Sequence, residues 1–147
     1  MEVREGMSSV VLTVGPGHTL RQAARLMTER GVGAAVVLDE ESPAPRVVSE
    51  RDILNSLGAG QDPDSEKVGD HMSDRVIAAA PDWSLERAAM EMARRHIRHL
   101  VVVEAGELIG VLSMRDIVRV WTSEGATSGM SPPENEGQPG SEQATAA

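Results

Sequence analysis

The 147-residue sequence contains no cysteine, phenylalanine or tyrosine, and its two tryptophans are its only aromatic residues of the Phe, Trp and Tyr class. The lack of cysteine excludes disulfide bonds, thiolate zinc sites and cysteine nucleophiles, and it fits a reducing cytoplasm. With so few aromatic rings, stacking of single-stranded nucleic-acid bases on exposed side chains is disfavoured. The core must therefore be built from Val, Leu, Ile, Ala and Met.

Positive charge is also scarce, with 14 Lys and Arg against 23 Asp and Glu and a net charge of −9. Such a chain repels nucleic-acid phosphates at long range, so a nucleic-acid partner is not expected. No window approaches the roughly 20 apolar residues of a membrane span, and the first ten residues lack the apolar run of a signal peptide. We expect a soluble, cytoplasmic protein of one domain or two small ones, without a separate catalytic domain.

An internal repeat organises most of the chain. Residues 3–38 and 68–103, which are offset by 65, are identical at 12 of 36 positions, whereas composition alone gives about three matches. After a change of one residue in register, residues 49–53 match residues 113–117 at four of five positions. The chain is therefore a duplication of one unit.

Each copy predicts the element order β-α-β-β-α, an α/β (α+β) fold with pseudo-two-fold symmetry. Thr19 and Ser84 are good N-caps for the first helices, and Gly31 suits a left-handed C-cap. Ser49 and Ser113 begin the closing helices. Apolar runs predict the strands at residues 10–14, 34–38 and 47–48 of the first copy and at 76–79, 100–103 and 108–112 of the second.

The connections and boundaries follow from the same pattern. Residues 39–46, with two prolines, predict a long loop, whereas Glu104–Glu107 predicts a tight hairpin turn. A unit of some 55 residues is too small to stand alone, so the copies are expected to pack sheet to sheet around one core. The predicted boundaries are residues 1–57 for the first motif, 58–67 for a linker, 68–121 for the second motif and 122–147 for a disordered acidic tail.

This pattern resembles the cystathionine β-synthase domain, or CBS domain, whose tandem pair is called a Bateman module. The resemblance covers residues 3 to about 121. It rests on the ordered repetition of the Met-Ser sequences before the first strands, the helix starts after Pro, the Val-Val runs and a terminal Ser-x-x-Asp. The segments that carry it best are Gly6-Met7-Ser8, His71-Met72-Ser73, Val48 to Ile53 and Gly110 to Ile117.

The resemblance implies a regulatory, non-enzymatic module that senses adenosine compounds in clefts between the two motifs. The implied ligands are AMP, ADP, ATP or S-adenosylmethionine, and no cofactor is required. It also implies a homodimer that acts on a regulated protein whose identity the sequence does not give.

The repeated Ser-x-x-Asp pattern has two physical interpretations. A carboxylate is a good bidentate acceptor for the two ribose hydroxyls, and a helix start adds free N–H groups for a phosphate. The same tetrapeptide is also a capping-box pattern that needs no ligand. Arg98 and His99 are similarly open, because they suit phosphate recognition and because cations also gather at helix C-termini.

The resemblance assigns these residues to two clefts of unequal quality. The second cleft is expected to lack the cations, because Gly33 and Ala34 stand at the positions of Arg98 and His99. The better ligand site is implied at Ser113, Asp116, Arg98, His99, Val111, Leu12 and Thr13. The weaker site is implied at Ser49, Asp52, Ile77 and Ala78.

Two other functions remain open on sequence alone. A ligand-free scaffold that dimerises or docks a partner uses the same fold. An enzyme is disfavoured, because the sequence offers no nucleophile–base pair, metal-ligand cluster or Gly-rich phosphate loop at catalytic spacing.

Overall fold

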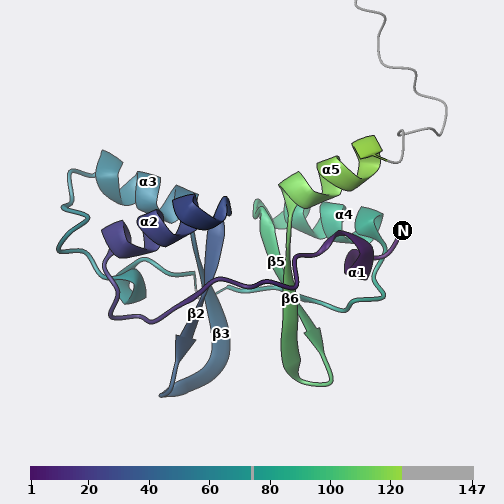
Figure 1. Cartoon of the computed structure of the whole chain (residues 1–147), viewed down its shortest axis with the longest axis horizontal. Helices are drawn as coiled ribbons and strands as arrows, with labels where there is room; N and C mark the ends of the chain where they lie inside the picture. The colour runs from purple at the N-terminus through teal and green to yellow at the C-terminus, as the bar shows by residue number, and fades with distance from the viewer. Residues whose placement is uncertain (74, 124–147) are drawn as a thin grey trace, which may run out of the picture.

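The predicted order β-α-β-β-α is confirmed for both copies in the computed structural model, which describes residues 1–73 and 75–123 (Figure 1). The first half contains β1 (Thr13–Val14), α2 (Leu20–Arg30), β2 (Ala34–Asp39), β3 (Ser42–Ser49) and α3 (Glu50–Gly58). The second half contains β4 (Ala78–Ala79), α4 (Leu85–Arg95), β5 (His99–Glu104), β6 (Glu107–Ser113) and α5 (Met114–Ser123). Two short segments that the sequence did not predict precede the halves: α1 (Val3–Gly6) and a 3-10 turn at Val68–Asp70.

The helix ends follow the local sequence signals. Thr19 and Gln22 form the predicted capping box, in which each side chain accepts a hydrogen bond from the other residue's backbone N–H. Gly31 ends α2 in the left-handed conformation with φ 65°, which glycine adopts without steric cost. His96 takes the same role after α4 with φ 54°.

Each half carries one three-stranded sheet, in the order β1-β2-β3 or β4-β5-β6. The first pair of strands is parallel and the second is antiparallel in both sheets. The hairpin between β5 and β6 turns at Ala105 and Gly106, both with positive φ, as the sequence predicted for Glu104–Glu107. Figure 1 shows the halves on either side of a vertical pseudo-symmetry axis.

The long loop predicted for residues 39–46 is wrong. Strand β3 begins at Ser42, which pairs with Asp39, so Glu40 and Glu41 form the turn. Pro43 and Pro45 lie within the strand. They are tolerated because β3 is an edge strand of its sheet, where an N–H can be absent without breaking an interior ladder.

Two apolar cores are present among the described residues, and the single core expected from the sequence is not found. The first groups side chains of α2, α3, β1, β2 and β3, and the second groups those of α4, α5, β4, β5 and β6. Each lies on one face of its sheet. Val36 and Val101 are 1% exposed and belong to neither core. They lie on the other face of each sheet, because successive strand residues point to opposite faces.

Each core is completed by a residue from the other half of the sequence. Val3, before the first strand, is fully buried in the core of the second half, and Val68 is fully buried in the core of the first. The backbone supports both crossings, since Val3 N–H donates to Trp83 O at 2.8 Å and Val68 N–H to His18 O at 2.8 Å. Residue 68 is therefore where the repeated sequence begins again, but the residues of the two cores are not separated at this point.

The crossing chains also extend the sheets of the opposite half. Ser8 and Val111 exchange two backbone hydrogen bonds of 2.9 and 3.0 Å, and Ser73 N–H donates to Val47 O at 2.8 Å. Gly110 permits the first crossing, because a Cβ there would lie 2.8 Å from both Met7 Sδ and Ser8 O. The two halves are thus joined by interleaved chain and not by side-chain contact alone.

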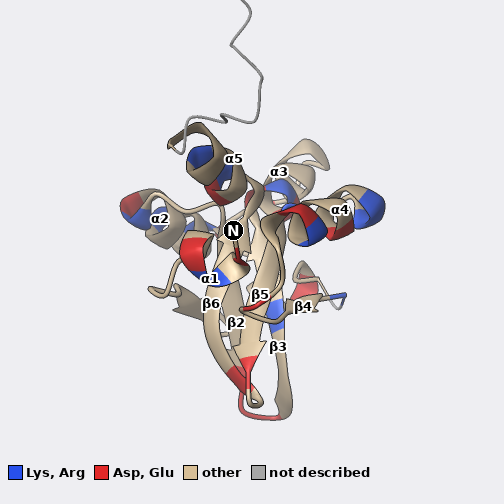
Figure 2. Cartoon of the chain, turned by 90° about the vertical axis from the view of Figure 1, so that its right-hand side faces the viewer, with Lys and Arg blue, Asp and Glu red and all other residues tan. Residues whose placement is uncertain are grey.

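Charge is distributed unevenly over the described surface. The hairpin ends carry acidic side chains, while the helices carry charges of both signs (Figure 2). At the first hairpin these are Asp39, Glu40 and Glu41.

Helix α5 continues through Thr122 and Ser123, two residues past the predicted boundary, and the rest of the predicted tail, 124–147, lies outside the described residues.

We expect Gly110→Ala to lower the free energy of unfolding by about 1–3 kcal/mol, because the new methyl group would collide with a backbone oxygen of the crossing segment. Gly17→Ala is the matched control, since a Cβ at Gly17 meets nothing within 4 Å, and it should change the value by less than about 0.5 kcal/mol. Urea unfolding followed by circular dichroism measures both. Equal stability of the two variants would contradict the tight crossing.

Candidate functional site

A cavity of about 590 Å³ lies between the two halves and is the larger of the two described here. Its walls come from the segment before β1, the start of β2, the start of β5, strand β6 and the first turns of α3 and α5. It brings together six of the seven residues predicted for the better site: Leu12, Arg98, His99, Val111, Ser113 and Asp116.

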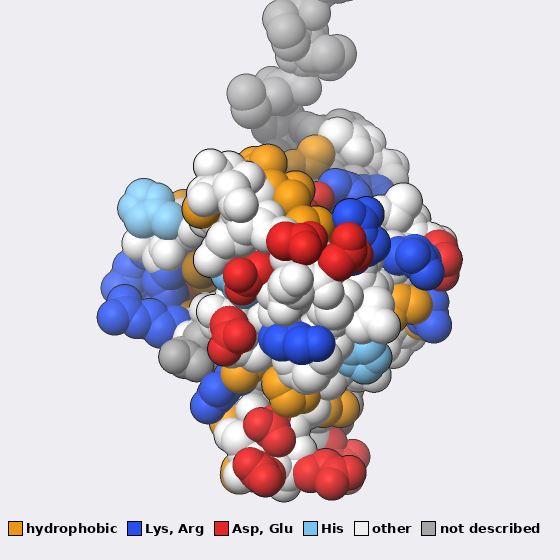
Figure 3. Space-filling model, turned by 90° about the vertical axis from the view of Figure 1, so that its left-hand side faces the viewer, with side chains coloured by type: hydrophobic (Ala, Val, Ile, Leu, Met, Phe, Trp, Pro, Cys, Tyr) orange, Lys and Arg blue, Asp and Glu red, His pale blue; other side chains and the backbone are white. Residues whose placement is uncertain are grey.

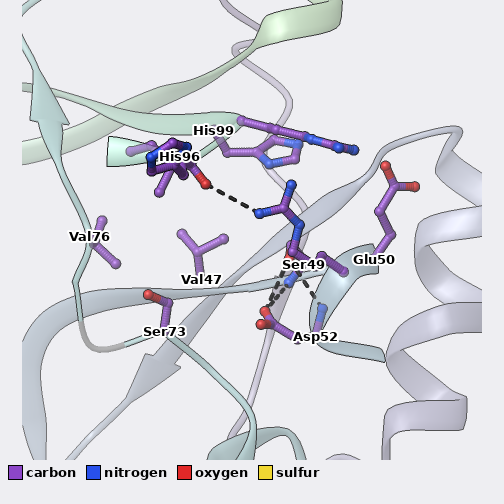
Figure 4. A pocket seen from close by; sticks show the side chains of 11 residues that line it. Val47, Ser49, Glu50, Asp52, Ser73, Val76, His96 and His99 are labelled. Carbon is purple, nitrogen blue, oxygen red and sulfur yellow. Dashed lines mark hydrogen bonds between the residues drawn. The ribbon is translucent and has the colours of Figure 1, made fainter. Parts of the chain in front are cut away.

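A smaller cavity of about 180 Å³ lies beside α3 and is shown in Figure 4. Ser49 and Asp52, predicted for the weaker site, both line it. In Figure 4, Ser73 and Val76 face this space from the crossing segment before β4, and His99 lies across from Ser49.

The expectation that this second cleft lacks cations is wrong. The cations Arg51 and Arg98 both line the smaller cavity, together with the imidazoles of His96 and His99. Arg51 lies there because its side chain reaches across to donate to the backbone oxygen of His96 at 3.3 Å. Comparing the two copies position by position does not reveal these cations, because Arg98 and His99 reach the smaller cavity from the opposite half of the chain.

Three predicted residues do not line either of these two cavities. Thr13 lies in β1 opposite Val36, and Ala78 lies in β4 opposite Val101. Ile77 packs against the apolar core of the second half. The walls are instead formed by Val10 to Leu12 before β1 and by Val76 before β4.

Both Ser-x-x-Asp segments form reciprocal caps at the starts of α3 and α5. In the first, Ser49 N–H donates to Asp52 Oδ2 at 2.8 Å, and Asp52 N–H donates to Ser49 Oγ at 3.4 Å (Figure 4). In the second, Ser113 N–H donates to Asp116 Oδ2 at 2.8 Å, and the returning bond is 3.0 Å. The capping interpretation is therefore present in the structure.

Capping does not consume either carboxylate. Each uses Oδ2, and a carboxylate has about four acceptor positions. Oδ1 of Asp116 accepts only a long contact of 3.4 Å from Arg119 among the hydrogen bonds found for it. Both aspartates are half-buried and line their cavities. The same side chain can thus hold the helix start and accept further hydrogen bonds from a ligand.

His99 is half-buried between the two cavities and lines both. Burial lowers the pKa of its imidazole below the usual value of 6.5, although the carboxylates of Glu50 and Asp116 act in the opposite direction. Arg115 and Arg98 add to the lowering. At neutral pH the ring is therefore uncharged, and it can donate or accept one hydrogen bond at each nitrogen according to its tautomer.

Several wall residues were not predicted from the sequence. Gly33, Ala34 and Glu50 line the larger cavity, and Arg51 lines the smaller. Glu50 and Arg51 lie inside the Ser-x-x-Asp segment itself, so its position at a helix start was a usable signal. Gly33 and Ala34 carry no functional group that sequence reasoning could identify.

Neither a metal-holding cluster nor a membrane-spanning helix is found in residues 1–73 and 75–123. No group of three or more His, Asp or Glu side chains in this part of the chain is placed to hold a metal ion. Its helices are also too short and too polar for any to cross a membrane.

Comparison with known proteins gives a consistent family. A family model described as the CBS domain matches residues 2–59 and 68–123. The chain is 33% identical over 130 residues to the CBS domain-containing protein YhcV of Bacillus subtilis, covering 87% of this chain and 91% of that protein. It is also 33% identical over 112 residues to protein MK0525 of Methanopyrus kandleri, of whose length it spans 57%.

Solved structures share the architecture. The hexameric CBS-CP12 protein from bloom-forming cyanobacteria superposes with a TM-score of 0.75 at 28% identity, covering 80% of this chain and 69% of that one. The CBS domain pair of protein MJ0100, solved in complex with 5′-methylthioadenosine and S-adenosyl-L-methionine, gives a TM-score of 0.73 and covers 82% and 99%. At a sequence identity of 20%, this TM-score shows a common fold and nothing more.

The lowered pKa of His99 predicts a pH-dependent loss of stability. As the pH falls below 6.5, the unfolded chain takes up a proton at this residue before the folded chain does, so the free energy of unfolding decreases. We expect His99→Gln to weaken this decrease between pH 7.5 and 5.5 in urea titrations. Identical slopes for His99→Gln and wild type would contradict the prediction.

Proposed function

The chain belongs to the CBS-domain family, and we propose that it is a regulatory module that binds an adenosine ligand in its larger cavity. CBS-domain pairs are regulatory ligand-binding modules. The single observation that carries the proposal is the convergence of Asp116, Ser113 and Arg98 on one cavity of about 590 Å³. That volume lies in the range of small-molecule sites, about 300–1,000 Å³.

The chemistry of the walls supports a nucleoside ligand. Asp116 has acceptor capacity left for the two ribose hydroxyls, and Ser113 adds a hydroxyl beside it. Arg98 offers a planar pair of donors to a phosphate, near the N-terminal end of α5. Val10, Leu12 and Val111 give an apolar surface for the base. The fold itself holds adenosyl ligands in the domain pair of MJ0100.

The smaller cavity supports a second, weaker site. Its volume of about 180 Å³ is about a third of the other's. Ser49 and Asp52 repeat the chemistry of Ser113 and Asp116 there, and Arg51 adds a cation. We assign it a nucleoside or a small anion in preference to a full nucleotide.

A ligand-free scaffold is the second candidate function, and the apolar side chains exposed on the helices favour it. Met114, Val118 and Trp121 of α5 are 39%, 54% and 43% exposed, and Leu54 of α3 is 67% exposed. Apolar side chains are visible at the helix-bearing upper end in Figure 3, with acidic side chains at the lower tip. Neither function requires catalysis, and the proposal is of a non-enzymatic protein.

We propose that this helix face joins two copies in a homodimer. Light scattering should give twice the chain mass of 15.7 kDa, and Leu54→Glu should give the monomer mass by placing a charge in the contact. Leu38→Glu is the matched control, because Leu38 is 53% exposed in β2, away from the helices. A monomeric wild type would overturn the dimer.

For ligand binding, Asp116→Ala and Asp52→Ala form a matched pair, since each removes one capping box at a cost of about 1 kcal/mol. We expect excess AMP to raise the melting temperature of the wild type and of Asp52→Ala, but not of Asp116→Ala. Arg98→Gln should weaken AMP binding and leave adenosine binding unchanged. The absence of any thermal shift or binding heat with adenosine, AMP, ADP, ATP and S-adenosylmethionine would refute the ligand-binding function and leave the scaffold.

A further inference from the structure

The larger cavity is walled on two sides by equivalent joints, one from each half. In the first half, Glu50 N–H donates to Gly33 O at 2.9 Å, which fixes the start of α3 to the residue before β2. In the second half, Met114 N–H donates to Arg98 O at 2.8 Å, which fixes the start of α5 to the residue before β5. All four residues line the cavity. The backbones therefore match, and the side chains do not.

The two joints present opposite charges to the cavity. The residue before the strand is Arg98 in one joint and Gly33 in the other. The first helix residue is Met114 in one and Glu50 in the other. The Glu50 carboxylate lies against Gly33, since a Cβ on that glycine would be 3.1 Å from Glu50 Oε1. Gly33 thus leaves the space that this carboxylate fills.

The ionisable side chains that line the cavity are balanced in charge. Glu50 and Asp116 are negative, Arg98 and Arg115 are positive, and His99 is held neutral by burial. Asp116 also contacts Arg119 at 3.4 Å, while Glu50 makes no side-chain hydrogen bond or ion pair among those found in the described residues. Glu50 and His99 line the same cavity, and the charge of the Glu50 carboxylate acts to raise the pKa of His99.

This charge pattern suits a ligand with a single anionic group. One phosphate can contact Arg98 directly, whereas each further phosphate adds net negative charge to a cavity whose two cations and two carboxylates already balance. Water screens this repulsion only in part, because the effective dielectric constant near such a wall is well below that of bulk water. We propose that Glu50 is a specificity-determining residue that favours adenosine ligands with one anionic group over those with a di- or triphosphate chain.

This inference rests on the proposed function and concerns the same cavity. It gives Glu50 a role that helix capping does not explain, since the cap of α3 is made by Ser49 and Asp52. It also gives the two halves different tasks in recognition. The second half supplies the polar groups for the ribose and the phosphate, and the first half supplies the carboxylate that disfavours further phosphates.

The test is calorimetric titration of the full chain with adenosine, AMP, ADP and ATP in magnesium-free buffer, for wild type and Glu50→Gln. We expect the wild type to bind AMP at least about tenfold more tightly than ATP. Glu50→Gln should raise the affinity for ATP about tenfold and the affinity for AMP less than about threefold, and it should leave the affinity for adenosine unchanged. A tenfold change is the size expected when one unit charge is removed from a partly solvated cavity. Added salt should shrink these differences.

Glu29→Gln is the matched control, because it removes the same charge from an exposed position on α2 that lines neither described cavity. It should leave the AMP to ATP ratio at the wild-type value. The inference is overturned if the wild type binds ATP as tightly as AMP, or if both variants change the ratio equally, and the proposed function then survives. A chain that binds none of the four ligands overturns the proposed function and this inference together.

Discussion

The rest of the structure depends on the reciprocal crossing of the two segments that precede β1 and β4. Val3 is buried in the core of the second half and Val68 in the core of the first, so neither core is complete without chain from the other half. A unit of this size buries too little apolar surface to be stable alone. The crossing also places Ser8 and Val10 to Leu12 in the wall of the larger cavity, and Ser73 and Val76 in the wall of the smaller one. The same crossing segments therefore complete the two cores and form part of the cavity walls.

On this symmetric backbone the chemistry is asymmetric. Duplication gives two capped helix starts that face two cavities, but the cavities differ about threefold in volume. Arg98 and His99 have no counterparts in the first half, and they lie between the cavities and line both. A single pair of side chains thus lines both cavities, and under the proposed function a ligand in one cavity would contact residues that the other cavity shares.

The aspartates of the two helix starts show how one residue can serve structure and recognition. Reciprocal hydrogen bonds with Ser49 or Ser113 hold Asp52 and Asp116 in fixed positions through one oxygen each. A side chain that is already ordered loses little further entropy when a ligand binds it. Capping and ligand binding, which the sequence presents as alternatives, are therefore compatible, and under the proposed function the cap would hold the carboxylate in place for the ligand.

The resemblance to the CBS domain implied seven residues for the better site, of which six line the larger cavity. The sequence by itself determined the duplication, the element order and the helix caps at Thr19 and Ser49. These features are local or repeat with a fixed spacing, so they can be read from residue order. Only the tertiary structure decided that β3 starts at Ser42, that the halves exchange Val3 and Val68, and that Glu50 faces Arg98 and His99 across a common cavity. The physical reason is that edge position, core completion and charge balance depend on which distant segments meet, and residue order along one copy does not contain that information.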